Sequence, residues 1–281
     1  MLKKLLKYDF KSVFKYWWIA AVSATALSVL GGFCLKILVD STAEETVFQP
    51  PEVLTISSSL LLMLTIMAIS AFSVISAILL FVRFYKNFFT DEAYLTFTLP
   101  VKRSTHLNSK LILGFVTQLA TGAVIILDAA LIIVIGLADK IFKKEVWEEF
   151  ILLAKEFFKE VDAYFWVFLL ETLFIMLIIS IAGLLFTYAC ITFASMITKK
   201  AKLITAIGIY YGATSVVSFV FSMIYLFGVD TIITFLDKLP ENSANLIIVL
   251  IALMVLLFVA MICTLLYTFE QWMLDRKLNL A

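Results

Sequence analysis

Charged residues are scarce in this sequence, and hydrophobic residues take their place. Of its 281 residues only 15% are charged and 63% are hydrophobic, and the mean hydropathy is +1.06. Soluble globular domains carry about 25% charged residues and are about half apolar. The composition therefore excludes an ordinary soluble domain and predicts an all-α integral membrane protein with several spans. A formal net charge of +1 gives no indication of a nucleic-acid partner.

Proline is nearly absent as well. The four prolines are Pro50, Pro51, Pro100 and Pro240, and all of them lie in the connections between apolar runs. Transporters that bind their substrate at broken helices interrupt those spans with glycine and proline. The spans of this chain are therefore expected to be continuous helices.

Residues that carry catalysis or hold metals are few and scattered. The single histidine is His106, and Cys34, Cys190 and Cys263 lie in apolar runs without CxxC spacing, which is typical of small buried side chains. None of the nine glycines belongs to a G-x-x-x-x-G-K-S/T phosphate loop. We expect a protein that is not an enzyme and holds no metal or cofactor. If ATP drives it, another subunit has to bind the ATP.

Six apolar runs are long enough to cross a bilayer, whose core requires about 20 residues of helix. They lie at about 17–38, 54–82, 111–137, 164–190, 203–228 and 245–268. No internal repeat or long linker separates them, so we expect one membrane domain over residues 1–281.

The basic residues indicate the orientation of these spans. With the N-terminus in the cytoplasm, 15 of the 22 lysines and arginines fall on the cytoplasmic side, whereas 14 acidic residues fall outside and 5 inside. Cytoplasmic loops are enriched in lysine and arginine. Both termini are therefore predicted to be cytoplasmic.

Two further segments have helical amphipathic patterns. Residues 1–16, within MLKKLLKYDFKSVFKYWW, combine apolar residues at helical spacing with five lysines, which predicts a helix in the inner interface; the alternative is a signal peptide. Residues 139–163, on the outside, alternate apolar and charged faces in the same way. That outer helix is either a lid or receptor-like element, or a helix that rests on the outer leaflet.

Two acidic residues, Asp128 and Glu171, lie well inside apolar runs. Carboxylates are costly in hydrocarbon and usually face a pathway or a polar partner. Both positions fall in the outer half of the predicted membrane, so we name them as possible pathway residues that share a wet cavity. Tolerated polar groups, or for Glu171 a position in outside water, are the alternatives.

The connection at 83–110 is unusual for a cytoplasmic segment. Six aromatic residues occur between positions 84 and 97, and an exposed patch of that kind requires a cover. Thr90 is a candidate N-cap for a short helix that has Asp91 and Glu92 in its first turn and ends before Pro100. Such a helix suits docking on a protein; an interfacial helix with an aromatic belt is the alternative.

The string FYKNFFTDEAYLTFTLPVKR at 84–103, together with RKLNL at 276–280, resembles ABC-2 type permeases of the six-span kind found in Gram-positive bacteria. Members typically read DEGYL followed by FTLPV, and this chain departs at Ala93, where glycine is common. The resemblance covers nearly the whole chain. It implies a type V exporter-like fold in the plasma membrane.

The resemblance also implies partners and a site. A second permease copy and two separate ATPase subunits would complete the transporter, and residues 83–110 would hold the coupling helix. The implied coupling residues are Phe88, Phe89, Asp91, Glu92, Tyr94, Leu95, Phe97, Leu99 and Pro100. The expected substrate is hydrophobic or amphipathic, such as a drug or an antimicrobial peptide. A non-transporting signalling partner and a gradient-driven secondary transporter are the alternatives.

Overall fold

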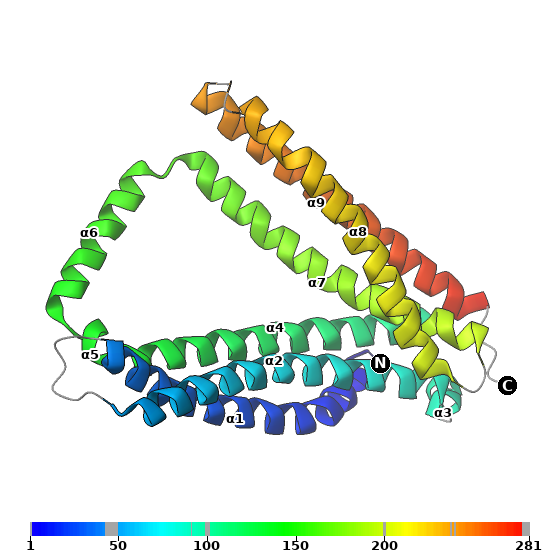
Figure 1. The fold of residues 1–281 in the computed structure, drawn as a ribbon. Helices are drawn as coiled ribbons and strands as arrows, with labels where there is room; N and C mark the ends of the chain where they lie inside the picture. The colour runs from blue at the N-terminus through cyan, green and yellow to red at the C-terminus, as the bar shows by residue number, and fades with distance from the viewer. Residues whose placement is uncertain are drawn as a thin grey trace. The chain divides into compact units, whose positions relative to one another are not determined.

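A computed structural model describes residues 2–42, 50–90, 92–98, 102–198, 201–236, 238 and 240–276. All regular structure in these ranges is helical (Figure 1). The helices are α1 (Leu2–Thr42), α2 (Glu52–Phe89), α3 (Glu92–Thr98), α4 (Arg103–Gly136), α5 (Ala138–Ile141), α6 (Lys144–Glu160), α7 (Ala163–Ile197), α8 (Lys202–Leu236) and α9 (Glu241–Arg276).

Six of the described helices are long and apolar enough to cross a membrane, namely α1, α2, α4, α7, α8 and α9. Each contains one of the six apolar runs of the sequence to within a residue, and each is unbroken over its described length. Hydrocarbon cannot hydrogen-bond the backbone, so a span has to satisfy its own N–H and C=O groups, as a continuous helix does. The prediction of six spanning helices is confirmed.

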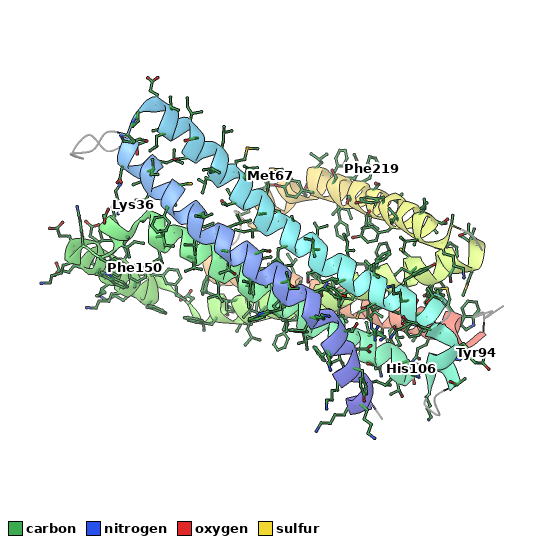
Figure 2. All side chains as sticks on the ribbon, turned by 90° about the horizontal axis from the view of Figure 1, so that it is seen from below. Lys36, Met67, Tyr94, His106, Phe150 and Phe219 are labelled. Atoms are coloured by element: carbon green, nitrogen blue, oxygen red, sulfur yellow. The ribbon has the colours of Figure 1, made fainter. Side chains whose placement is uncertain are left out.

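The N-terminal amphipathic segment is not a separate helix. Residues 2–16 form the first turns of α1, which continues into the first span because no proline or glycine interrupts the chain there. Figures 1 and 2 show α1 bending near this end. Asp9 is buried, and Arg83 on α2 donates to its Oδ1 from Nε (3.2 Å) and Nη2 (3.1 Å). This ion pair holds the first turns of α1 against α2.

The chain forms two compact units. Unit 2 comprises residues 3–83 and 116–160, and unit 1 comprises residues 1–2, 84–115 and 161–281. In unit 2, α1 packs against α2 and α4 around a core of Trp17, Ala21, Ala24 and Phe72. Trp17 of α1 contacts Thr121 of α4, and Leu35, later in α1, contacts Gly136, later in α4. Helix α1 therefore runs parallel to α4.

Small residues let these helices approach closely. A Cβ at Gly31 would lie 2.6 Å from the Thr65 hydroxyl oxygen, and one at Gly32 would lie 2.7 Å from the Ile135 Cβ. A Cβ at Gly136 would lie 2.6 Å from the Leu35 Cγ. Membrane helices use small residues in this way, because close backbones gain van der Waals contact that lipid does not offset.

Unit 1 is built around α7, which packs against both α8 and α9. The first turns of α4 join it: a Cβ at Gly114 would lie 2.9 Å from a methyl carbon of Leu184 on α7. The last turns of α2 and the short helix α3 belong to the same unit. Unit 1 therefore holds the predicted docking connection from residue 84 onward.

We predict that Gly136→Ala destabilises the chain whereas Gly122→Ala, in the same helix, does not. No atom lies within 4 Å of a Cβ at Gly122, but a Cβ at Gly136 overlaps Leu35. Overpacking costs about 1 to 3 kcal/mol, whereas alanine is favoured over glycine in a helix by about 1 kcal/mol. Thermal unfolding of the purified full chain in detergent measures the difference. Equal unfolding temperatures for the two variants would contradict the packing at Leu35.

Candidate docking segment and buried polar groups

The connection between the second and third spans contains a short helix, as the sequence predicted, but its start differs. The second span continues as α2 to Phe89, and α3 begins only at Glu92. The Thr90 hydroxyl donates backward to the Lys86 carbonyl (2.6 Å), and the Thr90 carbonyl accepts from the Ala93 N–H (2.8 Å). Thr90 thus ends α2 with its side chain, which differs from the expected N-cap role.

Two of the six aromatic residues in this connection are covered by the chain itself. Phe84 and Phe88 are buried, and Phe84 stacks on Phe88 (centroids 4.8 Å apart) and on Tyr188 of α7 (4.0 Å apart, interplanar angle 7°). The chain itself therefore supplies part of the cover that these aromatic residues require, because α7 contributes an aromatic ring from far along the sequence. Phe88, which the resemblance implied as a coupling residue, is buried against Phe84 and does not lie on the surface.

The described part of α3 presents polar and aromatic groups outward. Tyr94 is 69% exposed and is labelled in Figure 2, Glu92 lies exposed in the first turn, and Ala93 is buried. Phe89, at the end of α2, is half-buried. Of the other implied coupling residues, Asp91, Leu99 and Pro100 lie outside the described residues, as do the side chains of Leu95 and Phe97.

The start of α4 is fastened to the end of α9. Arg103 Nη1 donates to the carbonyl oxygens of Leu274 and Asp275 in the last turn of α9, and side chains commonly bind the last carbonyl groups of a helix in this way. Asn108 Oδ1 accepts from the Tyr267 hydroxyl (2.8 Å), to which Gln271 Nε2 also donates (2.9 Å). We call the hydrogen bonds from Arg103 to α9 the Arg103 clamp. The chain is thus attached to other helices on both sides of α3, by the Phe84–Tyr188 stack before it and by the Arg103 clamp after it.

A buried carboxylate that the sequence analysis missed lies beside this clamp. Glu270 of α9 is fully buried, and the Thr192 hydroxyl of α7 donates to its Oε1 (2.6 Å). Its Oε2 has no hydrogen-bond partner among the described residues. Glu270 lies two residues beyond the last predicted span, where a carboxylate is normally taken as solvated. The spacing of Tyr267, Glu270 and Gln271 could have indicated this buried site, because residues three and four apart share one helix face.

A row of polar side chains joins α1, α2 and α4 in unit 2 and forms a polar seam. Thr121 of α4 accepts a hydrogen bond from the Trp17 indole N–H of α1 (2.9 Å), and its hydroxyl lies 2.7 Å from that of Ser76 on α2. Farther along, the Ser28 hydroxyl lies 3.3 Å from Asp128 Oδ1 and also donates to the Thr25 carbonyl (2.7 Å).

Asp128 is fully buried in this seam, and its Oδ2 has no hydrogen-bond partner among the described residues. Its described hydrogen-bond partner is the Ser28 hydroxyl of α1. Glu171 is half-buried on α7 and belongs to unit 1. The structure does not bring the two acids into one unit, and their shared pathway stays a prediction.

No group of three or more histidine, cysteine, aspartate or glutamate side chains that could hold a metal ion occurs in the described ranges. The three cysteines are free; Cys34 and Cys190 are buried and Cys263 is partly buried. Comparisons of the chain with protein-family models, with curated proteins and with solved structures found no match.

We predict that Asp128→Asn leaves folding unchanged and impairs function. Asparagine has the shape of aspartate and keeps an oxygen next to Ser28, so only the ionisable group is lost. A carboxylate at membrane depth costs free energy and is retained where it has a role. The measurements are thermal unfolding of the purified chain, and ATP hydrolysis in liposomes by the chain with the ATPase that the family resemblance implies.

Asp128→Leu and Ser28→Ala serve as controls for this prediction. Ser28→Ala keeps the carboxylate but removes its hydroxyl neighbour, so stability should fall with the ionisable group still present. Should Asp128→Leu unfold at a higher temperature and sustain normal hydrolysis, Asp128 would be a tolerated polar group without a role in function.

Proposed function

We propose that this chain is the membrane-spanning permease subunit of an ABC transporter and that α3 is the helix through which a separate ATPase drives it. The proposal depends most on the structure of the connection between α2 and α4. This connection contains a short helix with an exposed tyrosine and an exposed glutamate in its first turn. The two spanning helices that it joins are bound to α7 and α9 next to the connection.

The bracing explains how a push on α3 would reach the spans. On one side Phe84 stacks on Tyr188, whose hydroxyl donates to the Lys110 carbonyl (3.3 Å). On the other side Arg103 binds the last carbonyls of α9. A displacement of α3 would therefore act on α7 and α9 as well as on α2 and α4. A flexible loop would absorb such a displacement without moving any span.

The charge distribution supports a cytoplasmic location for α3. An orientation with both termini inside puts 15 of 22 basic residues in the cytoplasm. The six spans then place the connection between the second and third spans on the same side as the termini. ATPase subunits that use cytoplasmic ATP would meet α3 there.

The sequence resemblance extends the proposal to partners and substrate class. The functional unit would contain this chain, a second permease copy and two ATPase subunits in the plasma membrane of a Gram-positive bacterium. The cargo would be hydrophobic or amphipathic, such as a drug or an antimicrobial peptide, and would be exported when ATP-driven closure of the ATPases shifts the equilibrium between two arrangements of the spans.

One observation favours a second candidate. Asp128 has an unpartnered carboxylate oxygen in a buried seam, and proton relays in secondary transporters use acidic side chains at membrane depth. A gradient-driven transporter would need Asp128 but no ATPase on α3. Transport that persists without any ATPase, and stops on collapse of the proton gradient, would favour it over the permease.

We predict that Tyr94→Ala reduces co-purification of the ATPase roughly tenfold, which corresponds to about 1.4 kcal/mol. Exposed aromatic residues often contribute about 2 kcal/mol to an interface, and Tyr94 is 69% exposed, so its removal should not affect folding. The measurement is recovery of the ATPase with the tagged chain from native membranes, followed by ATP hydrolysis in liposomes. Tyr8→Ala is the matched control, because Tyr8 is 70% exposed on α1.

The charge reversal Glu92→Lys extends this test. A lysine in the first turn of α3 opposes the helix dipole by up to about 1 kcal/mol and repels any basic group on the partner. Glu52→Lys makes the same change in the first turn of α2, at the other end of that span. Unchanged recovery and hydrolysis for both Tyr94→Ala and Glu92→Lys would remove the coupling role from α3.

A further inference from the structure

We propose that α6 is a membrane-surface helix whose apolar face is occupied by lipid, at the leaflet where α4 ends and α7 begins. This inference requires only that the flanking helices span a membrane. It stands or fails independently of the permease proposal, because no ATPase or transported substrate enters it.

The side chains of α6 separate cleanly into two faces. At the helical rotation of about 100° per residue, eight apolar residues fall within an arc of about 160°. They are Val146, Trp147, Phe150, Ile151, Leu153, Ala154, Phe157 and Phe158. The opposite arc holds all the charged residues of the helix, namely Lys144, Glu145, Glu148, Glu149, Lys155, Glu156, Lys159 and Glu160, together with Leu152.

Much of the apolar face is exposed. Phe150 is 60% exposed and Leu153 62% exposed, and Trp147 is half exposed. Figure 2 labels Phe150 on this helix. An exposed aromatic surface of this kind marks a protein or membrane interaction site. The positions of the two ends of α6 favour the membrane.

The first end of α6 is held at the end of two spans. Leu35 of α1 packs against Gly136 at the end of α4, and Lys36 Nζ of α1 lies 2.9 Å from Asp139 Oδ2 of α5. Only Phe142 and Lys143 separate α5 from α6. The start of α6 is thus fixed at the membrane boundary that α1 and α4 reach.

The second end of α6 is connected directly to another spanning helix. Only Val161 and Asp162 separate α6 from α7, which begins at Ala163 and has Tyr164, Phe165 and Trp166 in its first turn. Aromatic residues of this kind concentrate at the membrane interface. With both ends at the boundary, a helix of 17 residues, about 25 Å long, lies along the surface and exposes its apolar face to lipid.

The charges specify the kind of lipid surface. The polar face of α6 carries five glutamates and three lysines, so it is slightly acidic rather than basic. Interfacial helices that select anionic lipids have basic polar faces. Binding of α6 therefore depends on burial of the aromatic face, and a zwitterionic leaflet is sufficient for it.

Site-directed fluorescence on the full chain tests the proposal. In a background with Cys34, Cys190 and Cys263 replaced by alanine, single cysteines are introduced as Phe150→Cys and Phe157→Cys on the apolar face and Glu148→Cys and Lys155→Cys on the polar face. Each is labelled with an environment-sensitive dye in zwitterionic vesicles. Brominated lipid should quench the apolar-face labels roughly twofold or more and iodide in the water should quench the polar-face labels, as for any in-plane helix.

Three other results would overturn the proposal. Equal quenching by iodide at all four positions would show that the helix stands in water. Self-quenching at positions 150 and 157 that disappears on dilution with unlabelled chain would show that a second copy covers the face. Protection from both quenchers only in the presence of a soluble fraction would show that a protein partner does.

The wild-type chain provides a second measurement that needs no substitution. A photoactivatable phospholipid in the same vesicles should form adducts on Trp147, Phe150, Phe157 or Phe158 and not on the charged face. Labelling of the spans without any adduct between residues 144 and 160 would also overturn the proposal. Partial replacement of the lipid by an anionic one should change the yield less than about twofold, because the polar face is acidic.

Discussion

Hydrocarbon offers no hydrogen-bond partners, and this constraint explains most of the architecture of the chain. Every backbone group in a span has to be satisfied by its own helix, which is why the described chain is made of long unbroken helices. The same constraint pairs polar side chains across helices: Trp17 with Thr121, Ser28 with Asp128, and Thr192 with Glu270. These bonds fix the register of neighbouring spans, because no competing partner exists in lipid.

The pairing has a functional consequence at the connection between α2 and α4. Glu92 and Tyr94 of the short helix α3 are exposed, but the residues on either side of α3 are bound to α7 and α9 through the Phe84–Tyr188 stack and the Arg103 hydrogen bonds. The exposed residues of α3 can contact a partner, while the residues that flank α3 pack against the spanning helices. Under the proposed function, this combination makes α3 a rigid coupling between an ATPase and the membrane helices.

Much of this architecture could be predicted from the sequence, because span length and hydropathy are local properties. The six apolar runs match the six long helices, and the short helix before Pro100 appears near its predicted place. Pairing between distant segments could not be predicted. Phe84 stacks on Tyr188, about 100 residues away, and Asp9 lies in a lysine-rich segment that gives no indication of Arg83. Glu270 was missed for a related reason, since hydropathy ends the last span before it.

Photo-crosslinking from α3 in native membranes tests the central claim most directly. A benzophenone amino acid at position 94 should form a crosslink to a protein that carries the G-x-x-x-x-G-K-S/T nucleotide-binding loop, whereas the same group at position 150, on α6, should not. Such a product at position 94 alone is what the proposed function predicts. Crosslinks from position 94 only to lipid, or to a protein without a nucleotide-binding loop, would contradict it.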